Sequence, residues 1–177
     1  MKDAFLPYGR QTIENDDVDA IANVLTNPFL TTGPLVTQFE DAVSKYVDAA
    51  DTIVCTSGTA ALHLALLAAE IGSGSHVIVP TVTFLATANV ARHVGAEVVF
   101  ADVDPDTGLM GPEQLAEAVA RIGKKLSVGA ILPVHLAGQV PDMKAIADIA
   151  RPLGAAVIED NWPCPTNRNC SIKIFYF

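Results

Sequence analysis

Residues 57–59 place a serine, a glycine and a threonine between a β-branched segment and a helical segment rich in Ala and Leu. Where a strand leads into a helix in this way, free backbone N–H groups, a hydroxyl and the positive end of the helix dipole converge on one point, which suits a phosphate. The alternative is an ordinary Ser/Thr N-cap on a buried helix, and the local sequence alone favours it. Both alternatives place the start of a helix at Ser57, Gly58 and Thr59.

Two carboxylates, Glu159 and Asp160, end the apolar segment 155–160. Adjacent residues of a strand point to opposite faces, so these two cannot serve as an acid and base pair on one face. A single carboxylate near a phosphate site has little use in hydrolysis, but it suits a ligand whose ring nitrogen must stay protonated. Pyridoxal phosphate combines a phosphate, a flat ring and such a pyridine nitrogen.

Two other side chains follow expected strands, and a third lies within an expected helix. Phe84 belongs either to the core or to a site where its ring stacks on a flat ligand. His135 could orient a ligand group or satisfy a backbone carbonyl, and the second role is favoured. His63 lies in a segment that is apolar on every side, which favours a packed or interface histidine over a catalyst.

No metal site is expected. Asp102, Asp104 and Asp106 alternate as in a calcium loop, with Glu113 at the twelfth position. Thr107 stands where an EF-hand requires glycine, and a strand precedes the loop where a helix is required. A solvated turn that caps the next helix is the favoured interpretation. The three cysteines lack the close pairing of a zinc site or a redox motif.

The elements that would position these residues follow from the apolar pattern. Short β-branched segments alternate with helical stretches, and these segments are continuously apolar, as strands covered on both faces require. The pattern predicts an α/β fold, a three-layer α/β/α sandwich with a mainly parallel sheet, whose ligands bind beyond the carboxyl ends of the strands. The expected strands are residues 52–57, 76–81, 97–102, 128–134 and 155–160.

The N-terminal segment predicts two amphipathic helices. The first is opened by Asn15, closes at Asn27 and Pro28, and has an expected core stripe of Val18, Ile21, Val24 and Leu25. The second begins near Pro34, with Val36, Phe39, Val43 and Tyr46 at helical spacing. We divide the chain into a helical segment (residues 1–51), a ligand-binding domain (52–160) and a tail (161–177).

Composition limits the possible partners. The 177 residues carry 20 Asp and Glu against 11 Lys and Arg, a net charge of −9, which disfavours nucleic acid and anionic membrane surfaces. The first residues lack the apolar region of a signal peptide, and the apolar run at 60–69 is too short to span a bilayer. We therefore expect a cytoplasmic protein.

Seven motifs occur in the order and spacing of a known family. The chain resembles the DegT/StrS-like nucleotide-sugar aminotransferases, a branch of the fold-type-I pyridoxal phosphate (PLP) enzymes, over residues 6–160. The resemblance implies the PLP-dependent transferase large domain, in incomplete form. It rests on LPYGRQTI, FLTTGP, SGTAALHLAL, VIVPTVTFLATANV, DVDPDTG, PVHLAGQVPDM and VIED.

The resemblance also implies roles for individual residues. Gly58 and Thr59, with Ser57 beside them, correspond to the cradle of the cofactor phosphate. Phe84 corresponds to the aromatic residue that stacks on the pyridine ring, and Asp160 to the carboxylate that binds the ring nitrogen. Thr31, Thr32 and Gly33 occupy the loop that approaches the sugar substrate.

The implied reaction transfers an amino group from glutamate to a keto group on a nucleotide-linked deoxysugar, for amino-sugar and glycan biosynthesis. The motifs are most similar to the branch that aminates C4 of UDP-linked 4-keto-6-deoxy sugars. Members of the family are homodimers with the active site at the interface. Two alternatives are a non-catalytic α/β module that binds a phosphate-bearing ligand and an inactive truncated product.

The resemblance stops at Asp160. The family usually has His or Gln three positions later, where this chain has Pro163, and the tail fits a reading-frame slip or aberrant junction better than a divergent terminus. The resemblance places the lysine that forms the Schiff base with PLP well beyond the aspartate. Lys173 comes too early and lacks the family's neighbouring Ser and Gly. We therefore expect the chain as it stands to have no aminotransferase activity.

Overall fold

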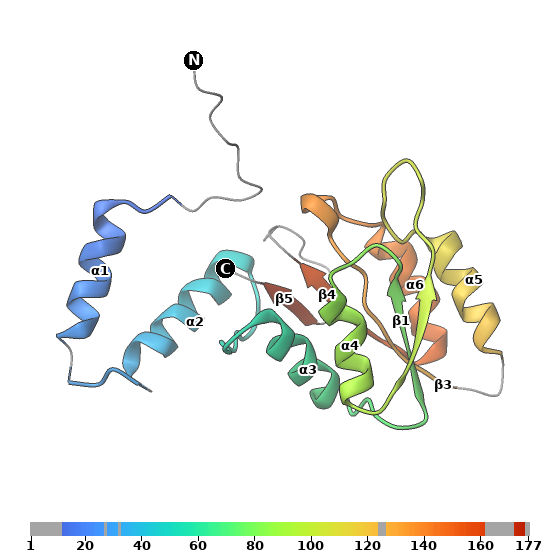
Figure 1. The fold of residues 1–177 in the computed structure, drawn as a ribbon, viewed down its shortest axis with the longest axis horizontal. Coiled ribbons are helices and arrows are strands. Elements are labelled where there is room, and N and C mark those ends of the chain that lie inside the picture. Colours follow the sequence, from blue (N-terminus) through green and yellow to red (C-terminus); the bar gives the residue numbers. More distant parts are fainter. Residues whose placement is uncertain (1–11, 27, 32, 124–126, 162–171, 176–177) are drawn as a thin grey trace, which may run out of the picture.

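The computed structural model of the chain describes residues 12–26, 28–31, 33–123 and 127–161, together with the backbone of 172–175. Its element order confirms the α/β class, with helical and strand segments alternating from residue 58 to residue 161 (Figure 1). The helices are α1 (Asn15–Leu25), α2 (Pro34–Val47), α3 (Gly58–Ala68), α4 (Leu85–His93), α5 (Pro112–Ile122), the short 3-10 turn η1 (Leu136–Gly138) and α6 (Met143–Leu153). The strands are β1 (Ser75–Pro80), β2 (Glu97–Ala101), β3 (Ser127–Ile131), β4 (Ala156–Asn161) and β5 (Ile172–Phe175).

The strands form one parallel sheet in the order β2-β1-β3-β4-β5. The register aligns Ile78 with Val99 and with Ile131, and Val157 with Ile131. Helices α4, α5 and α6 each connect two of these parallel strands, so each must run back along the sheet. The ladder therefore confirms the mainly parallel sheet that the continuous apolar segments predicted.

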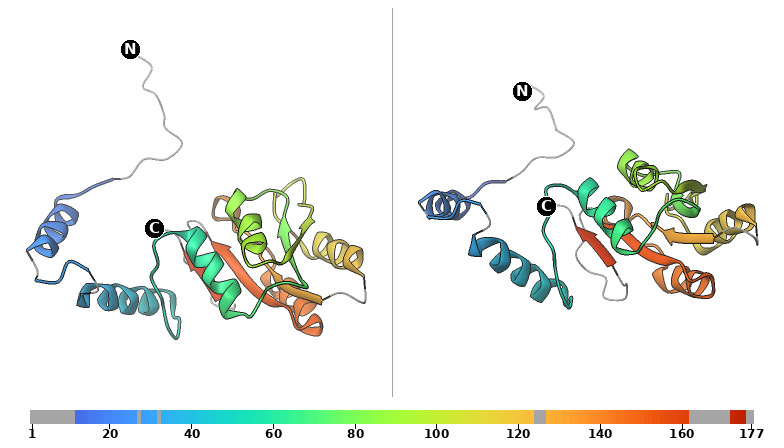
Figure 2. Two further views of the ribbon diagram at one scale, coloured as in Figure 1. Left: turned by 60° about the horizontal axis from the view of Figure 1, so that its bottom comes forward. Right: turned by 90° about the horizontal axis from the view of Figure 1, so that it is seen from below.

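Two buried apolar clusters fill the spaces between the sheet and its helices, as a three-layer sandwich requires (Figures 1 and 2). One cluster joins α3 and α4 to one face of the sheet through residues such as Leu66, Val79 and Ile158. The other joins α5 and α6 to the opposite face through Leu115, Ile146 and Val157. Strand residues alternate between the two clusters, as the period of a strand demands.

Residues 52–57, expected to be a strand, are not one. The segment is tied to α2 instead: Ser44 Oγ donates to Thr52 Oγ1 at 2.6 Å, and the N–H of Val54 donates to Glu40 Oε1 at 2.9 Å. Ile53 is 84% exposed. The sequence pattern predicted the wrong state here because a strand needs a hydrogen-bonded neighbour, and no strand of the described ranges pairs with this segment.

The two N-terminal helices form with nearly the expected bounds, but the expected core stripe of the first is wrong. Gly33 is the N-cap of α2 and Pro34 its first residue, whereas α1 is capped by Glu14 and begins at Asn15. Helix α1 has no buried residue, and Figures 1 and 2 show it standing away from the sheet. Its apolar stripe therefore remains exposed, and on α2 only Val43 and Val47 are buried.

The tail contributes the edge strand β5, which pairs with β4 in parallel. Its register places Lys173 opposite Glu159 and Ile174 opposite Asp160. An unpaired strand edge offers a row of free N–H and C=O groups, so β4 is a ready template for such a segment. The edge of β4 is therefore covered by β5, while Pro163 lies outside the described residues.

Candidate functional site

The carboxyl edge of the sheet is formed by the strand ends and by the first residues of the helices packed against them. Helix α4 follows β1 directly, so its N-terminus lies at this edge, and α3 ends shortly before β1 begins, so it runs in the same sense. Figure 1 shows α3 and α4 side by side on one face of the sheet, and the His63 and His93 rings meet edge to face between them. The positive ends of two helix dipoles thus lie at the edge where ligands of parallel sheets bind.

Glu159 and Asp160 lie on opposite faces of β4, as predicted. Their neighbours establish this, because Val157 packs in the α5/α6 cluster and Ile158 in the α3/α4 cluster. Both carboxylates are buried, with Glu159 fully enclosed and Asp160 5% exposed. Asp160 therefore belongs to the face that carries α3 and α4, and Glu159 to the other.

Asp160 is bound by a residue that sequence reasoning missed. Thr87, fully buried on α4, donates its hydroxyl hydrogen to Asp160 Oδ2 at 2.5 Å. Thr83 Oγ1 lies 2.8 Å from Thr87 Oγ1. The sequence offered one signal for this network, two threonines four residues apart around the start of a helix, but it did not say which strand they face.

His135 pairs with Glu159, so the expected bond from its ring to a backbone carbonyl is wrong. The His135 Nε2 and Glu159 Oε2 atoms are 2.8 Å apart, and neither side chain is exposed. The backbone of His135 donates to the Asp160 carbonyl at 3.0 Å, and the N–H of Asp160 donates to the Pro133 carbonyl at 2.9 Å. The two groups lie at ion-pair distance without the geometry of a hydrogen bond, so the segment after β3 places an imidazole directly against the buried carboxylate.

Helix α3 begins where both the phosphate-site and the N-cap interpretations place its start. Ser57 is the N-cap, and its hydroxyl accepts the N–H of Ala60 at 3.2 Å. Gly58 and Thr59 are the first two residues of the helix, whose N–H groups have no acceptor within a helix. The N-cap is therefore confirmed, and it is compatible with an anion in front of the helix.

Phe84 does not lie in the core. It is the N-cap residue of α4, its side chain is 77% exposed, and its carbonyl accepts the N–H of Thr87 at 3.0 Å. An aromatic ring exposed at the carboxyl edge is available to a flat ligand. Thr83, the residue before it, links the same loop to the Asp160 network.

The loop between α1 and α2 lies on the far side of α2 from the sheet in Figures 1 and 2. Thr31 and Gly33 belong to it, and Thr32 lies outside the described residues. The structure does not bring this loop beside Asp160. Its approach to a sugar therefore stays a prediction.

The loop after β2 is closed by hydrogen bonds to Asp104. Asp104 Oδ1 accepts the N–H groups of Asp106 and Thr107 and the Thr107 hydroxyl at 2.9 to 3.0 Å. These bonds, those of Thr107 first, hold the pKa of Asp104 below its usual range. No group of three metal-ligating side chains occurs among the described residues.

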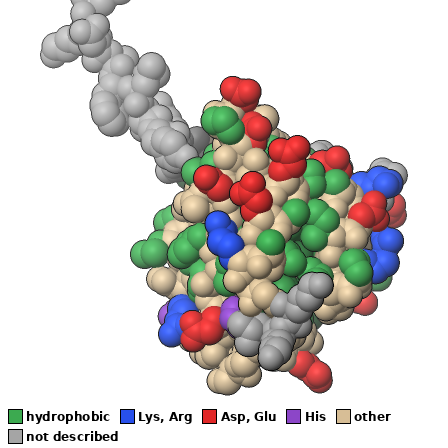
Figure 3. All heavy atoms as spheres, turned by 90° about the vertical axis from the view of Figure 1, so that its right-hand side faces the viewer, with side chains coloured by type: hydrophobic (Ala, Val, Ile, Leu, Met, Phe, Trp, Pro, Cys, Tyr) green, Lys and Arg blue, Asp and Glu red, His purple; other side chains and the backbone are tan. Residues whose placement is uncertain are grey.

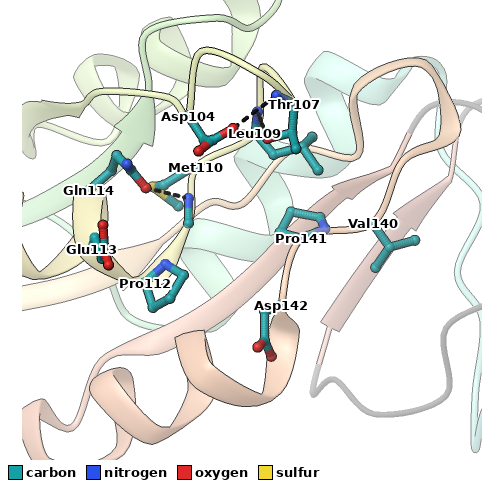
Figure 4. A pocket seen from close by; sticks show the side chains of 11 residues that line it. Asp104, Thr107, Leu109, Met110, Pro112, Glu113, Gln114, Val140, Pro141 and Asp142 are labelled. Atoms are coloured by element: carbon teal, nitrogen blue, oxygen red, sulfur yellow. Dashed lines mark hydrogen bonds between the residues drawn. The ribbon is translucent and has the colours of Figure 1, made fainter.

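The same loop borders a hollow of about 400 Å³ on the α5/α6 side of the sheet (Figure 4). Its lining includes Asp104 and Asp142, and both carboxylates already accept backbone hydrogen bonds. We expected the turn at Asp104 to cap the next helix, and this is wrong, because Gly111 is the N-cap of α5 and Gln114 Oε1 accepts its N–H. Figure 3 shows acidic side chains gathered at the top of the neighbouring surface, which disfavours a phosphate there.

No helix in the ranges that the structure describes has both the length and the apolar character needed to cross a membrane.

Comparison with known proteins assigns the chain to a family of aminotransferases. The model of the DegT/DnrJ/EryC1/StrS aminotransferase family matches residues 11–162. The UDP-4-amino-4-deoxy-L-arabinose–oxoglutarate aminotransferase of Shewanella sediminis is 38% identical over 160 residues, which are 90% of this chain and 40% of that protein. The spore coat polysaccharide biosynthesis protein SpsC of Bacillus subtilis is 40% identical over 156 residues, 88% of this chain and 39% of that protein. The chain spans about two fifths of the length of these relatives.

Solved structures agree with the fold. The sugar aminotransferase Spr1654 of Streptococcus pneumoniae in its PMP form superposes with a TM-score of 0.80 at 27% identity, covering 90% of this chain and 43% of that one. A DegT DnrJ EryC1 StrS aminotransferase from Brucella abortus superposes with a TM-score of 0.77 at 41% identity, covering 80% and 39%. The Spr1654 protein was also solved in a PLP form.

Proposed function

This chain belongs to the DegT/DnrJ/EryC1/StrS aminotransferase family, and from this premise we propose that its residues 52–160 form part of the cofactor domain of a PLP-dependent sugar aminotransferase. The observation that carries the proposal is the Asp160 carboxylate. It is buried at the carboxyl end of β4 and lies on the face of the sheet that carries α3 and α4.

The donor set fits the three parts of PLP. Asp160 would hold the pyridine nitrogen, because a buried carboxylate is a strong partner for a cationic N–H. Gly58 and Thr59, with Ser57 beside them, would hold the phosphate through the N–H groups at the start of α3 and the hydroxyl of the exposed Thr59. The exposed ring of Phe84 would lie against the ring face. When bound, the cofactor supplies an electron sink for carbanion chemistry.

The roles of the protein residues follow from this arrangement. Asp160 would keep the ring nitrogen protonated, and its burial would keep water from competing for the carboxylate. The helix end at Ser57 would hold the phosphate and thereby orient the cofactor. Phe84 would pack against the cofactor ring.

The proposed substrates are glutamate, as amino donor, and a nucleotide-linked keto-deoxysugar, which is aminated at C4 in the UDP-linked form. Support comes from the Shewanella relative, whose name pairs a UDP-4-amino sugar with oxoglutarate, the keto acid that glutamate leaves behind. The product would be an amino sugar for glycan synthesis. The loop at Thr31, Thr32 and Gly33 is proposed to approach the sugar.

We also propose that the intact parent is a cytoplasmic homodimer. The exposed apolar residues of α1 and α2, among them Ile21, Leu25 and Phe39, support a partner surface on these helices.

A calorimetric titration of this chain with pyridoxamine phosphate tests the cofactor site. This ligand lacks the aldehyde that would react with any lysine, so it reports the site alone. We expect binding that falls at least tenfold in Asp160→Ala and in Thr59→Val, and that is weaker for pyridoxamine, which has no phosphate. Absence of binding by the wild-type chain would overturn the proposal.

The second candidate function, a non-catalytic module for phosphate esters, is favoured by the N-cap geometry of α3 alone. It predicts that simple phosphate esters bind equally well to the wild type and to Asp160→Ala. In that case the carboxylate is structural.

Catalytic competence of this chain is tested by borohydride reduction with PLP, followed by mass spectrometry. We propose that no single stoichiometric adduct forms on Lys173, whose backbone register partner in β4 is Glu159 and not Asp160. An adduct there, together with transamination of a UDP-ketosugar, would refute this part of the proposal.

A further inference from the structure

We propose that Thr83 and Thr87 form a one-way hydrogen-bond relay that positions the Asp160 carboxylate, with Thr87 as the positioning residue. The purpose of the relay, to position a cofactor-binding carboxylate, rests on the proposed function. The relay itself does not. Its basis is the buried hydroxyl of Thr87, which lies between two other side-chain oxygens.

The direction of the relay follows from the supply of hydrogens. An ionised carboxylate can only accept, so the hydrogen of the 2.5 Å bond must come from Thr87. A threonine hydroxyl has a single hydrogen, and Thr87 has then used it. In the 2.8 Å hydrogen bond between Thr83 and Thr87, Thr83 must therefore be the donor.

A chain of donors that ends on a carboxylate acts on that carboxylate in two ways. It stabilises the ionised form, because a hydrogen bond to a charged acceptor is stronger than one to a neutral acceptor. It also restricts rotation of the carboxyl group, because Oδ2 is held by a side chain that is itself fixed in a packed helix. Each donor in the series polarises the next and strengthens it.

The relay joins three separate segments of the chain at the carboxyl edge. Thr83 lies in the loop after β1, Thr87 in α4 and Asp160 at the end of β4. The N–H of Thr87 also donates to the carbonyl of Phe84. Thr87 thereby fixes two residues that would contact opposite features of the cofactor, the ring nitrogen and the ring face.

A buried threonine in a helix usually satisfies its hydroxyl on the carbonyl four residues earlier. Thr87 instead reaches the side chain of the residue at that position, Thr83, and continues to a carboxylate 73 residues away. The hydroxyl is therefore committed to the site and not to its own helix.

The first test needs no cofactor. The carboxyl carbon of Asp160 is followed by NMR through a pH titration of the full chain in the wild type, Thr87→Val and Thr87→Ser. Valine matches threonine in shape but has no hydroxyl, whereas serine keeps the hydroxyl. We expect Thr87→Val to raise the midpoint of Asp160 by about one pH unit, and Thr87→Ser to leave it within a few tenths.

Thr83→Val removes the outer donor and is expected to shift the midpoint in the same direction by less. This half-buried position also keeps the proposal falsifiable if Thr87→Val fails to fold, which circular dichroism would detect. An unchanged Asp160 midpoint in folded Thr87→Val, or in Thr83→Val where the first variant does not fold, overturns the relay.

The second test is the titration with pyridoxamine phosphate. We expect Thr87→Val to weaken binding about tenfold and Thr87→Ser to restore it. If the wild-type chain does not bind the ligand, the proposed function fails and the NMR titration still decides the relay. If the wild type binds, and Thr87→Val neither moves the Asp160 midpoint nor weakens binding, the relay fails and the proposed function stands.

Discussion

At the scale of single residues, the carboxyl end of β4 shows how neighbouring acids acquire different surroundings. Asp160 receives a hydroxyl donor from α4, and Glu159 lies 2.8 Å from the imidazole of His135 on the other face. Burying a carboxylate and an imidazole costs hydration, which their close contact offsets only in part. The pair therefore adds little net stability, but removing one partner leaves the other buried polar group without a contact, and this lowers stability.

The His135→Ala substitution should lower the free energy of unfolding by about 3 kcal/mol, because it leaves the buried Glu159 without its partner. Urea unfolding followed by circular dichroism measures the loss. The matched control is Lys144→Ala, which breaks an exposed pair with Asp148 and should change stability little. Equal effects of the two substitutions would contradict the buried pair.

Asp104 gives a prediction for acid pH. The pKa of Asp104 in the folded chain is lowered, chiefly by the hydrogen bonds from Thr107. Its contribution to the stability of the fold is therefore fully present at pH values above the usual pKa range of an aspartate. The contribution is lost as the pH falls through the lowered value. Asp104→Asn should therefore unfold at a lower temperature than the wild type at pH 7, and the difference should shrink below pH of about 4. Calorimetric scans that give a constant difference from pH 7 to pH 3 would contradict this assignment.

At the scale of elements, helix N-termini at the carboxyl edge differ in what they face. Ser57 caps α3 beside the proposed cofactor site, and Asp142 caps α6 on the other side of the sheet. Both side chains accept the N–H of the third helical residue, Ala60 and Ala145 respectively. The two caps make the same side-chain hydrogen bond, which makes them a matched pair for its removal.

Ser57→Ala and Asp142→Ala should each lower the free energy of unfolding by about 1 kcal/mol, the usual cost of losing an N-cap. Only Ser57→Ala should also weaken pyridoxamine phosphate binding, because only α3 faces the proposed phosphate position. Thermal unfolding and calorimetric titration of both variants separate the two effects. Equal binding by both variants would leave Ser57 with the role of a cap alone.

At the scale of the whole molecule, the described part of the chain is one well-packed α/β layer structure with uncovered helices beside it. Helix α1 has no buried side chain, and Val18, Ile21 and Leu25 are each more than half exposed. A contiguous apolar stripe of this kind favours association in water.

The chain should therefore self-associate as its concentration rises. Replacing all three residues, Val18, Ile21 and Leu25, by glutamine should reduce this association. The melting temperature should stay nearly unchanged, because these side chains are already exposed in the folded chain. Sedimentation velocity over a range of concentrations provides the measurement. Ala20→Gln with Asn23→Gln, on the opposite side of α1, serves as control and should associate like the wild type.

Much of the fold could be predicted because it depends on local periodicity. Continuous apolar segments indicated strands buried on both faces, and β1, β2, β3 and β4 overlap four of the five expected segments. The alternation within β4 placed Glu159 and Asp160 on opposite faces before any contact was known. The starts of α2 and α3 followed from Pro34 and Ser57, whose effects act within one turn.

What local pattern could not decide was which segments meet. Residues 52–57 have a strand-like sequence but no ladder partner in the described part of the chain, and no described residue buries the apolar stripe of α1. The partners of the two acids, Thr87 for Asp160 and His135 for Glu159, lie 73 and 24 residues away along the chain. Only tertiary structure brings them together, because pairing across such distances depends on the packing of whole helices against the sheet and not on any preference of the residues themselves.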